Sequence, residues 1–366
     1  MMNRRELGQR ALSYAAAASS ASAAAPKPAG KSRRNLLMHV GGDYHSVAGS
    51  GMGSKENLEY NLRYGVRHLT AQIRGRSPDG GWDFDEIRKL KDDCGQYGLT
   101  LEAIRMDANY IGMRPGAERD RQLDVIAGNI EKASRAGVKI ITYHWTLIPI
   151  RRNRQATGRG NVRYAGFKLE DNWKDLPVGK AGKVSSEEYW ERIGYFLEKI
   201  IPTAKQYGVK MACHPYDPPG LPFGYQGAEN WDSPSVFAAI KRYESIVDSP
   251  YNGFQLCLGT AAEGLKDPKT GILPIVKYLG GRRKLCQVHM RNIRGGLGDF
   301  LEVYPDEGDM DLFQVMRVLR DVQFDGSICP DHMPRHPGDP GSLQSFAFGY
   351  GYIQALIQAV NSEVPA

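Results

Sequence analysis

Four near-identical phrases punctuate the chain: Tyr64-Gly65-Val66, Tyr97-Gly98-Leu99, Ala136-Gly137-Val138 and Tyr207-Gly208-Val209. In each phrase a glycine follows a stretch of helical periodicity and precedes a short apolar run. Glycine suits the C-terminal cap of a helix, where φ is often positive, and the apolar residue after it suits the start of a buried strand. Each phrase therefore predicts a joint where a helix ends and a strand begins.

Apolar runs and segments of helical period alternate along the chain after the first 35 residues. The helical segments include Asp83–Gln96, Arg119–Ala136, Ser186–Gln206 and Met310–Val322. The candidate strands are Leu36–Val40, Val66–Ile73, Leu99–Ile104, Val138–Tyr143, Val209–Cys213, Phe254–Leu258, Leu285–Met290 and Ser327–Pro330. Eight buried strands separated by helices predict an α/β fold, the (β/α)8 TIM barrel. The alternative is a doubly wound open sheet, but His39-Val40-Gly41-Gly42 lacks a dinucleotide-binding glycine pattern.

The composition fits one large catalytic domain over residues 36–362. The 366 residues are 41% hydrophobic and 24% charged, and they contain no run of eighteen strongly apolar residues, so no membrane span is expected. The net charge of +7 is spread over many segments without a nucleic-acid-binding motif. We therefore expect a small acidic substrate and no nucleic acid as partner. Assembly into a homo-oligomer is left open.

The first 35 residues differ in composition from the rest. Arg4-Arg5 precede an Ala- and Ser-rich tract, Ala11–Ala25, and then Pro26-Lys27-Pro28. This order is typical of a twin-arginine export signal, which would direct the protein to the periplasm. The alternative is a disordered tail on a cytoplasmic protein.

Metal-ligand residue types stand at the predicted carboxyl ends of strands four to eight. In a barrel these ends meet at one face, where function collects. The ends of the last four strands therefore predict a metal site made of His214, Cys257, His289 and Asp331. The other cysteines, Cys94, Cys213, Cys286 and Cys329, are interpreted as packing residues without disulfides.

Two imidazoles, a thiolate and a carboxylate suit a divalent ion of intermediate softness, namely manganese, iron(II), cobalt or zinc. A closed structural zinc site is the alternative, but closely spaced ligand pairs are missing. His332, next to Asp331, and Tyr350 are candidates for proton transfer, and Arg291 for holding a carboxylate.

Two further groups are assigned to the substrate side. His144, at the end of strand four, and Asn292, beside Arg291, are candidate substrate-binding residues. The arginine-rich segment Thr146–Lys180 is interpreted either as a basic lid over an anionic substrate or as a solvated surface excursion.

Five phrases together resemble mannonate dehydratase, in order and spacing from about Val209 to Tyr352. They are His214-Pro215-x-Asp217-Pro218-Pro219, Cys257-x-Gly259-Thr260, His289-x-Arg291-Asn292, Gly308-Asp309-x-Asp311 and Pro330-Asp331-His332. The resemblance implies a xylose-isomerase-like barrel that uses Mn²⁺ or Fe²⁺ to convert D-mannonate to 2-keto-3-deoxygluconate. It places the metal ligands on His214, Cys257, His289 and Asp331. It places acid-base roles on His332 and Tyr350, with Asp331 beside them in the catalytic set.

The chain departs from the family's pattern at several positions near these phrases. Tyr216 stands where the family has Asp, Met333 where it has Gly, and Cys329 where it has Arg. A His that the family has after its Phe-x-Glu pair is absent after Phe300-Leu301-Glu302, where Pro305 follows. These departures are therefore expected to affect substrate specificity more than ion binding. The alternatives are a metal-dependent sugar isomerase or epimerase, and a non-catalytic, metal-loaded sugar-acid binder.

Overall fold

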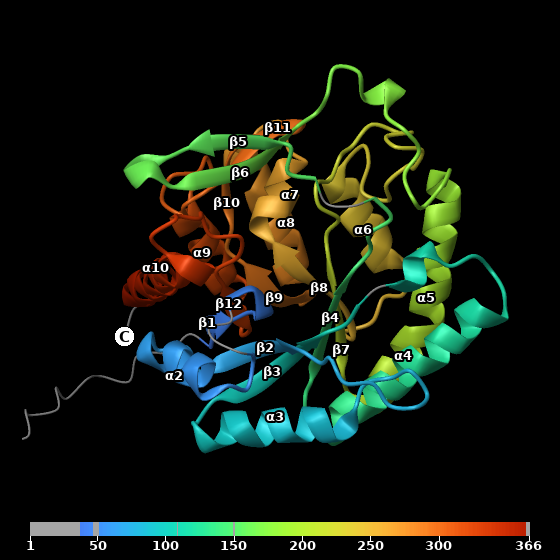
Figure 1. The fold of residues 1–366 in the computed structure, drawn as a ribbon, viewed down its shortest axis with the longest axis horizontal. Helices are drawn as coiled ribbons and strands as arrows, with labels where there is room; N and C mark the ends of the chain where they lie inside the picture. The colour runs from blue at the N-terminus through green and yellow to red at the C-terminus, as the bar shows by residue number, and fades with distance from the viewer. Residues whose placement is uncertain (1–36, 47–50, 108, 149–150, 364–366) are drawn as a thin grey trace, which may run out of the picture. The chain divides into compact units, whose positions relative to one another are not determined.

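A computed structural model describes residues 37–46, 51–107, 109–148 and 151–363. Within it, eight parallel strands close into a barrel in the order β1-β12-β9-β8-β7-β4-β3-β2 (Figure 1). Their bounds are β1 His39–Gly42, β2 His68–Gln72, β3 Thr100–Arg105, β4 Ile140–His144, β7 Lys210–His214, β8 Asn252–Cys257, β9 Leu285–His289 and β12 Ser327–Cys329. The TIM-barrel prediction is confirmed. The predicted tail, residues 1–35, lies outside the described residues, so it and the domain boundary stay predictions.

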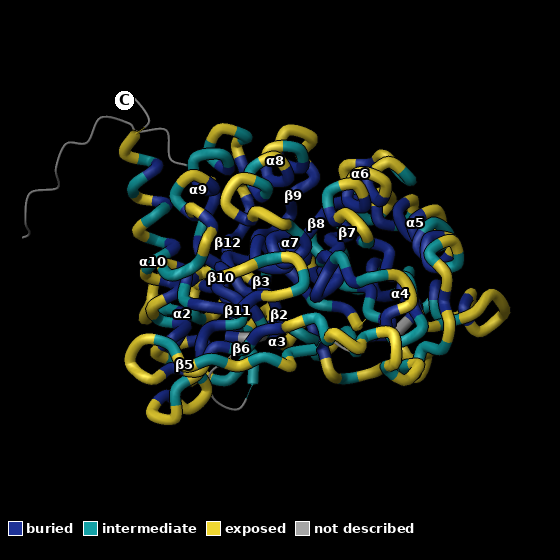
Figure 2. Tube along the Cα trace, turned by 90° about the horizontal axis from the view of Figure 1, so that it is seen from above, coloured by how far each residue is buried: buried dark blue, intermediate teal, exposed yellow. Residues whose placement is uncertain are grey.

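Helices surround the barrel, with buried faces toward the strands and exposed faces outward (Figure 2). They are α2 Lys55–Arg63, α3 Phe84–Gln96, α4 Ala117–Arg135, α5 Ser186–Tyr207, α6 Val236–Ile246, α7 Leu258–Glu263, α8 Pro268–Gly281, α9 Leu312–Asp321 and α10 Leu343–Ser362. The 3-10 turns are η1 Tyr44–Ser46, η2 Asn109–Gly112, η3 Arg159–Asn161, η4 Trp173–Asp175 and η5 Pro340–Ser342.

The glycine joints have the backbone that their sequence predicts. φ is 76° at Gly65, 68° at Gly98, 78° at Gly137 and 66° at Gly208. A residue with a Cβ adopts this left-handed conformation at a cost, so glycine lets each helix end and the chain turn directly into the next strand. These joints repeat the same helix-to-strand geometry around half of the barrel.

A polar layer crosses the barrel interior midway along the strands. The buried Gln287 Nε2 donates to Thr70 Oγ1 at 2.9 Å and to Ser327 Oγ at 3.0 Å. Its Oε1 accepts from Gln255 Nε2 at 3.0 Å. Gln287 and its three partners lie on four different strands, and their hydrogen bonds satisfy polar groups that burial would otherwise penalise. The layer separates the carboxyl end of the barrel from its amino end.

A second, four-stranded antiparallel sheet lies beside the carboxyl end of the barrel, in the order β10-β11-β6-β5 (Figure 1). Its hairpin β5 Arg154–Thr157 and β6 Arg163–Lys168 comes from the segment after β4. The other hairpin, β10 Asn292–Gly296 and β11 Asp299–Val303, follows β9. The segment predicted as a loop or lid is therefore anchored by strand pairing to a distant part of the chain.

Ion pairs neutralise most of the arginines on which the basic-lid interpretation rested. Arg151 pairs with Glu170, Arg152 with Asp217 and Glu302, Arg154 with Asp299, and Arg159 with Asp306. Because these guanidinium groups already face carboxylates of the chain, they fix the hairpin in place and offer little charge to a substrate.

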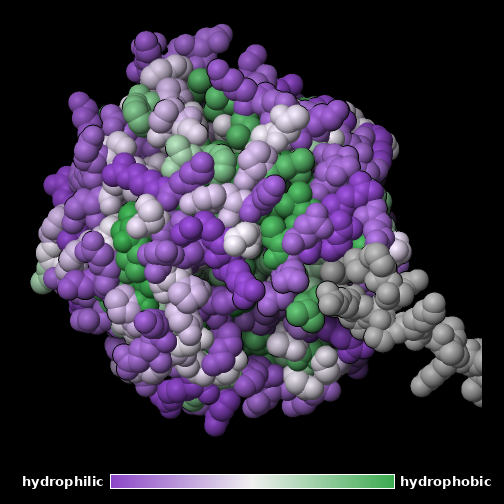
Figure 3. All heavy atoms as spheres, turned by 180° about the vertical axis from the view of Figure 1, so that it is seen from behind, coloured by the Kyte–Doolittle hydropathy of each residue, from purple (hydrophilic) through white to green (hydrophobic). Residues whose placement is uncertain are grey.

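The molecular face in Figure 3 is mostly hydrophilic, with apolar side chains in separate patches. Among the described residues, no helix has both the length and the apolar character that crossing a membrane requires. The large exposed hydrophobic side chains include Leu37, Val178 and Phe223, which lie far apart in the sequence. A homo-oligomer stays a prediction.

Candidate metal centre and active site

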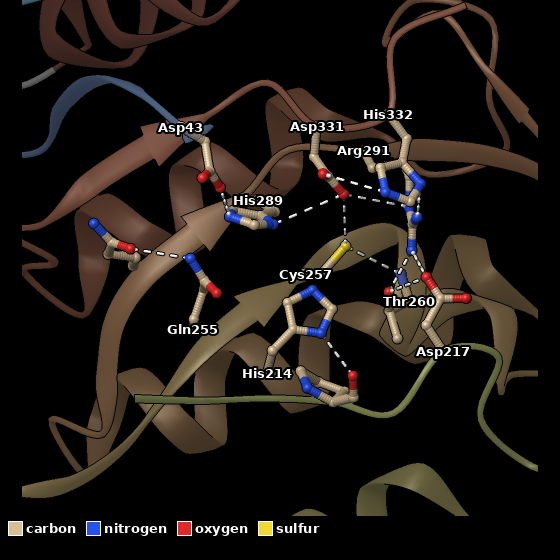
Figure 4. A network of polar contacts seen from close by, with 12 residues as sticks. Asp43, His214, Asp217, Gln255, Cys257, Thr260, His289, Arg291, Asp331 and His332 are labelled. Carbon is tan, nitrogen blue, oxygen red and sulfur yellow. Dashed lines mark hydrogen bonds and ion pairs between the residues drawn. The ribbon is translucent and has the colours of Figure 1, made fainter. Parts of the chain in front are cut away.

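The ends of β7, β8 and β9 bring His214, Cys257 and His289 together. One ligand atom from each lies within 4.8 Å of the others. Asp331, which follows β12, places Oδ2 3.5 Å from Cys257 Sγ and 3.7 Å from His289 Nδ1 (Figure 4). Four side chains far apart in sequence thus converge where neighbouring parallel strands end.

Hydrogen bonds orient both imidazoles toward Cys257. His214 Nδ1 is 2.6 Å from the Pro215 carbonyl oxygen, which leaves its Nε2 for the centre. His289 Nε2 is 2.5 Å from Asp43 Oδ2, which leaves its Nδ1 on the side of Asp331. A carboxylate or carbonyl behind a metal-binding histidine is the usual arrangement that sets ring orientation and tautomer. Asp43, after β1, was not predicted from the sequence.

The charges around Cys257 favour its thiolate. Burial alone would raise the pKa of this thiol, but Arg291 and hydrogen bonds from His214 and His289 lower it to about 5. A thiolate is the form that binds metal. The convergent set of two imidazole nitrogens, one thiolate and one carboxylate fits a divalent ion of intermediate softness.

His332 lies beside this centre with a strained backbone and a partly open side chain. Its φ is +34°, in a region that side-chain-bearing residues seldom adopt and that is often found at functional sites. Its Nδ1 is 2.7 Å from Glu302 Oε1, and its side chain is 31% exposed. Burial lowers the pKa of His332, but Asp331 and Glu302 outweigh it and raise the pKa to about 8. The imidazole is thus oriented from one side and accessible from the other.

Arg291 occupies a different position from the one expected of a substrate-binding residue. Its side chain is 1% exposed, and its guanidinium lies 2.9 Å from Asp217, 3.0 Å from Glu263 and 2.7 Å from Glu302. It also contacts Thr260 and His332 Nδ1. These partners use its donors, so Arg291 holds the acidic groups and His332 in place instead of facing a substrate carboxylate (Figure 4).

Two other predicted residues lie outside the cluster. Tyr350 is on α10, fully buried, and its hydroxyl donates to Ser46 Oγ at 2.6 Å and is 3.2 Å from Asn61 Oδ1. The segment that carries Tyr350, a predicted candidate for proton transfer, is helix α10, which packs on the outside of the barrel. Asn292 is 1% exposed and bonds to the backbone at Pro305, Met310 and Ile293. It fixes the turn after β11 and does not face the cluster.

Other groups at the carboxyl end of the barrel were not predicted, because the prediction used only the ends of strands four to eight. Arg105 ends β3, and its Nη2 is 3.1 Å from Nδ1 of His144, which ends β4 next to His214. The Arg105 guanidinium lies 4.7 Å from the ring centre of Tyr44, directly after Asp43. Burial raises the pKa of Tyr44 far above its usual value, and Asp43 adds to the effect. Asp43 and Arg105 follow the first and third predicted strands, so the same strand-end signal points to them.

Glu302, Asp217 and Arg152 are also part of the site. Burial raises the pKa of Glu302, but His332 and Arg291 lower it to about 2. Arg152, from the segment before β5, is 2.7 Å from Asp217 and 2.9 Å from Glu302. The sequence contained Asp217 and Glu302 in quoted motifs, but only the folded chain shows that they share the buried Arg291 and the partly buried Arg152.

The sequence of this chain matches the family model described as D-mannonate dehydratase (UxuA) over residues 171–364. It is 36% identical over 318 residues to a mannonate dehydratase of Streptococcus suis, covering 76% of this chain and 83% of that protein. It is 29% identical over 325 residues to that of Thermotoga maritima, covering 76% and 87%.

Solved structures show the same fold. The mannonate dehydratase from Streptococcus suis serotype2 has a TM-score of 0.73 at 23% identity, covering 90% of this chain and 96% of that one. A 3-keto-D-glucoside 4-epimerase from E. coli has a TM-score of 0.58 at 14% identity, covering 87% and 99%. From the family match and the Streptococcus suis relative, the chain belongs to the mannonate dehydratase family, whose members are hydro-lyases acting on a sugar acid.

Proposed function

We propose that this sugar-acid dehydratase eliminates water from D-mannonate, or a closely related aldonate, to give a 2-keto-3-deoxy sugar acid with the help of a divalent ion. The ion we propose is Mn²⁺ or Fe²⁺, with Zn²⁺ and Co²⁺ as further candidates, held by His214, Cys257, His289 and Asp331. The observation that carries the proposal is the convergence of the Cys257 thiolate on two imidazoles within 4.8 Å, in a chain of this family.

A bound ion supplies positive charge that stabilises the enediolate formed when the carbon next to a carboxylate loses its proton. The chain's own residues must then move two protons. His332 is placed for this, because its Nδ1 is held by Glu302 and its Nε2 lies 3.7 Å from Asp331 Oδ1, on the side of the proposed ion ligands. A histidine with a pKa of about 8 exists in both forms near neutral pH. His332 is therefore the proposed acid-base residue.

Tyr44 is the proposed phenol at this mouth, in place of Tyr350. It is a neighbour of Asp43, and its raised pKa keeps the hydroxyl protonated. A protonated phenol donates a hydrogen bond to a hydroxyl that leaves or to a carboxylate that binds.

Arg105 is the proposed cation for the substrate carboxylate. Its side chain is 16% exposed, and it lies at a strand end beside His144. Unlike Arg291, it is only partly neutralised, through Asp107 at 3.2 Å. A planar guanidinium beside an imidazole matches the shape and charge of a carboxylate.

The departures from the family's pattern bear on which hydroxyl groups of the substrate the site can recognise. The buried Tyr216 donates its hydroxyl to the Ile148 carbonyl oxygen at 2.9 Å, so it ties the segment after β4 to the end of β7. Cys329 is buried in β12, where it lies against Gly41 of β1. Neither Tyr216 nor Cys329 supplies the charged group that the family has at its position. The proposal therefore includes substrates closely related to mannonate.

Purified protein loaded with Mn²⁺ should be assayed against a panel of hexonates, with the 2-keto-3-deoxy product detected as its semicarbazone. We expect product from D-mannonate or one of its stereoisomers. Cys257→Ser should lose both metal, measured by elemental analysis, and product. Cys213→Ala is the matched control, because the neighbouring Cys213 faces Tyr243 of α6. An absence of product from every hexonate with metal bound would refute the proposal.

A further inference from the structure

A second cluster of metal-binding residue types lies at the amino end of the barrel. His39 is the first residue of β1, His68 is the first of β2, and Glu102 lies near the start of β3. Because these strands are parallel, their starts meet at the end opposite to Cys257 and its neighbours. The polar layer around Gln287 lies between the two ends.

Strand alternation places both imidazoles on the inner face of the barrel. His68 shares its face of β2 with Thr70, whose hydroxyl accepts from Gln287 of β9, a strand that is not a neighbour in the ring. His39 shares its face of β1 with Gly41, where an added Cβ would touch Ser327, another partner of Gln287. The two rings therefore line the amino-end opening of the barrel.

The three side chains meet through the atoms that could hold a cation. Glu102 Oε2 is 2.9 Å from His39 Nε2 and 2.9 Å from His68 Nδ1, and one ligand atom from each residue lies within 4.8 Å of the other two. The Leu37 carbonyl oxygen is 2.9 Å from His39 Nδ1, an outer contact that sets the ring and leaves Nε2 for a ligand. The side chains of His39, His68 and Glu102 are 26%, 34% and 13% exposed, so an ion from solvent can reach them.

An irregularity in β3 aims Glu102 at the two histidines. Leu69 of β2 pairs with Leu101, but the next residue, Thr70, pairs with Ala103. Glu102 is therefore the extra residue of a β-bulge. Bulges between parallel strands are rare, and they typically re-aim a side chain at a functional position. The strand thus gives up regular pairing at the one residue that completes the cluster.

We propose that His39, His68 and Glu102 form a second divalent-cation site, suited to zinc or a similar borderline ion, at the amino end of the barrel. Two imidazole nitrogens and one carboxylate oxygen are a ligand set that zinc accepts, with a position left for water. Asp325 acts on His39 with a further negative charge. A cation here links the first three strands and has a structural role, as expected of the amino face of a TIM barrel. The site is independent of the proposed reaction.

Cobalt(II) titration of the full-length, metal-free protein distinguishes the two sites, because only the centre with Cys257 gives a thiolate-to-cobalt charge-transfer band. Wild type should bind about two equivalents, with the band complete after about one. His68→Gln combined with Glu102→Gln should bind about one equivalent and keep the full band. Cys257→Ser should bind about one equivalent without it, even if the proposed reaction is wrong.

A retained charge-transfer band and an unchanged circular dichroism spectrum would show that the amino-end variant is folded. As a second measurement, zinc should raise the melting temperature of Cys257→Ser but not of Cys257→Ser combined with His68→Gln. A wild type that binds only one equivalent, or a double glutamine variant that still binds two, would overturn the second site.

Discussion

Arg291 is a buried charged residue, and its burial determines the effect of replacing it. Its guanidinium is 1% exposed and lies within 3.0 Å of carboxylate oxygens from Asp217, Glu263 and Glu302. Such a residue compensates buried negative charge, which water cannot do at this depth. Its role is therefore to hold the acidic groups and His332 in a fixed arrangement.

Replacing Arg291 by Met should lower the free energy of unfolding by about 3–5 kcal/mol, because the carboxylates it leaves behind stay buried and unpaired. Urea unfolding measures this change. Arg317→Met is the control, since that surface arginine pairs with Glu363 in solvent and its loss should leave the midpoint almost unchanged. Unchanged stability of Arg291→Met with a raised KM would instead support direct binding of the substrate carboxylate.

Arg105→Gln should raise the KM for the sugar acid roughly tenfold to a hundredfold, because a hydrogen bond to a charged group contributes about 1.5–3 kcal/mol. Metal content and folding should stay as in wild type, because the Arg105 side chain is not among the residues around Cys257. Steady-state kinetics with metal analysis checks both. Arg67→Gln, at an exposed position before β2, should not change KM, and an equal effect of the two substitutions would contradict the assignment.

At the scale of elements, the second sheet could not be predicted from the sequence. The barrel strands after β1 were predictable because each is a short, largely apolar run that follows a helical segment. β5 is Arg-Gln-Ala-Thr and β10 is Asn-Ile-Arg-Gly-Gly, which are short and polar and carry no comparable pattern. Their pairing depends on contacts between segments far apart in the chain, so local pattern could not reveal it.

The pairing of β6 with β11 depends on Gly166. A Cβ at this position would lie 2.1 Å from the Phe300 carbonyl oxygen, so Gly166→Ala must push the two strands apart. We expect a loss of about 1–3 kcal/mol in stability and a higher KM, because the sheet borders the mouth. Denaturant unfolding and kinetics measure the two effects. Gly194→Ala in α5 is the control: it meets no atom within 4 Å and should be neutral or slightly stabilising.

The site itself was predictable to the extent that strand ends determine it. His214, Cys257, His289 and Asp331 could be named because parallel strands bring their ends to one face. The direction of the Arg291 and Asn292 side chains could not be predicted, because their partners Glu302, Pro305 and Met310 lie in the second strand of the hairpin or after it. The acid-base role expected of Tyr350 came from the family resemblance, whereas in the folded chain Tyr350 lies in helix α10 and its hydroxyl bonds to Ser46.

For the whole molecule, the centre joins the ends of four neighbouring strands of the closed ring. An ion held by residues from β7, β8, β9 and the end of β12 binds only the folded barrel, so binding should stabilise the entire domain. Saturating Mn²⁺, at about 100 times its dissociation constant, should add about 2.7 kcal/mol and raise the melting temperature. Chelator should reverse the shift, and Cys257→Ser should show much less of it at the same Mn²⁺ concentration. A melting temperature that does not change with Mn²⁺ would argue against the proposed metal centre.

The antiparallel sheet near the mouth takes one hairpin from between β4 and α5 and the other from between β9 and α9. Ion pairs such as Arg159 with Asp306 join the two again beyond the strands. Neither hairpin can change length or sequence alone without leaving its neighbour unmatched. Redesign of the mouth of the barrel for another sugar acid must therefore replace the two hairpins together, as one unit.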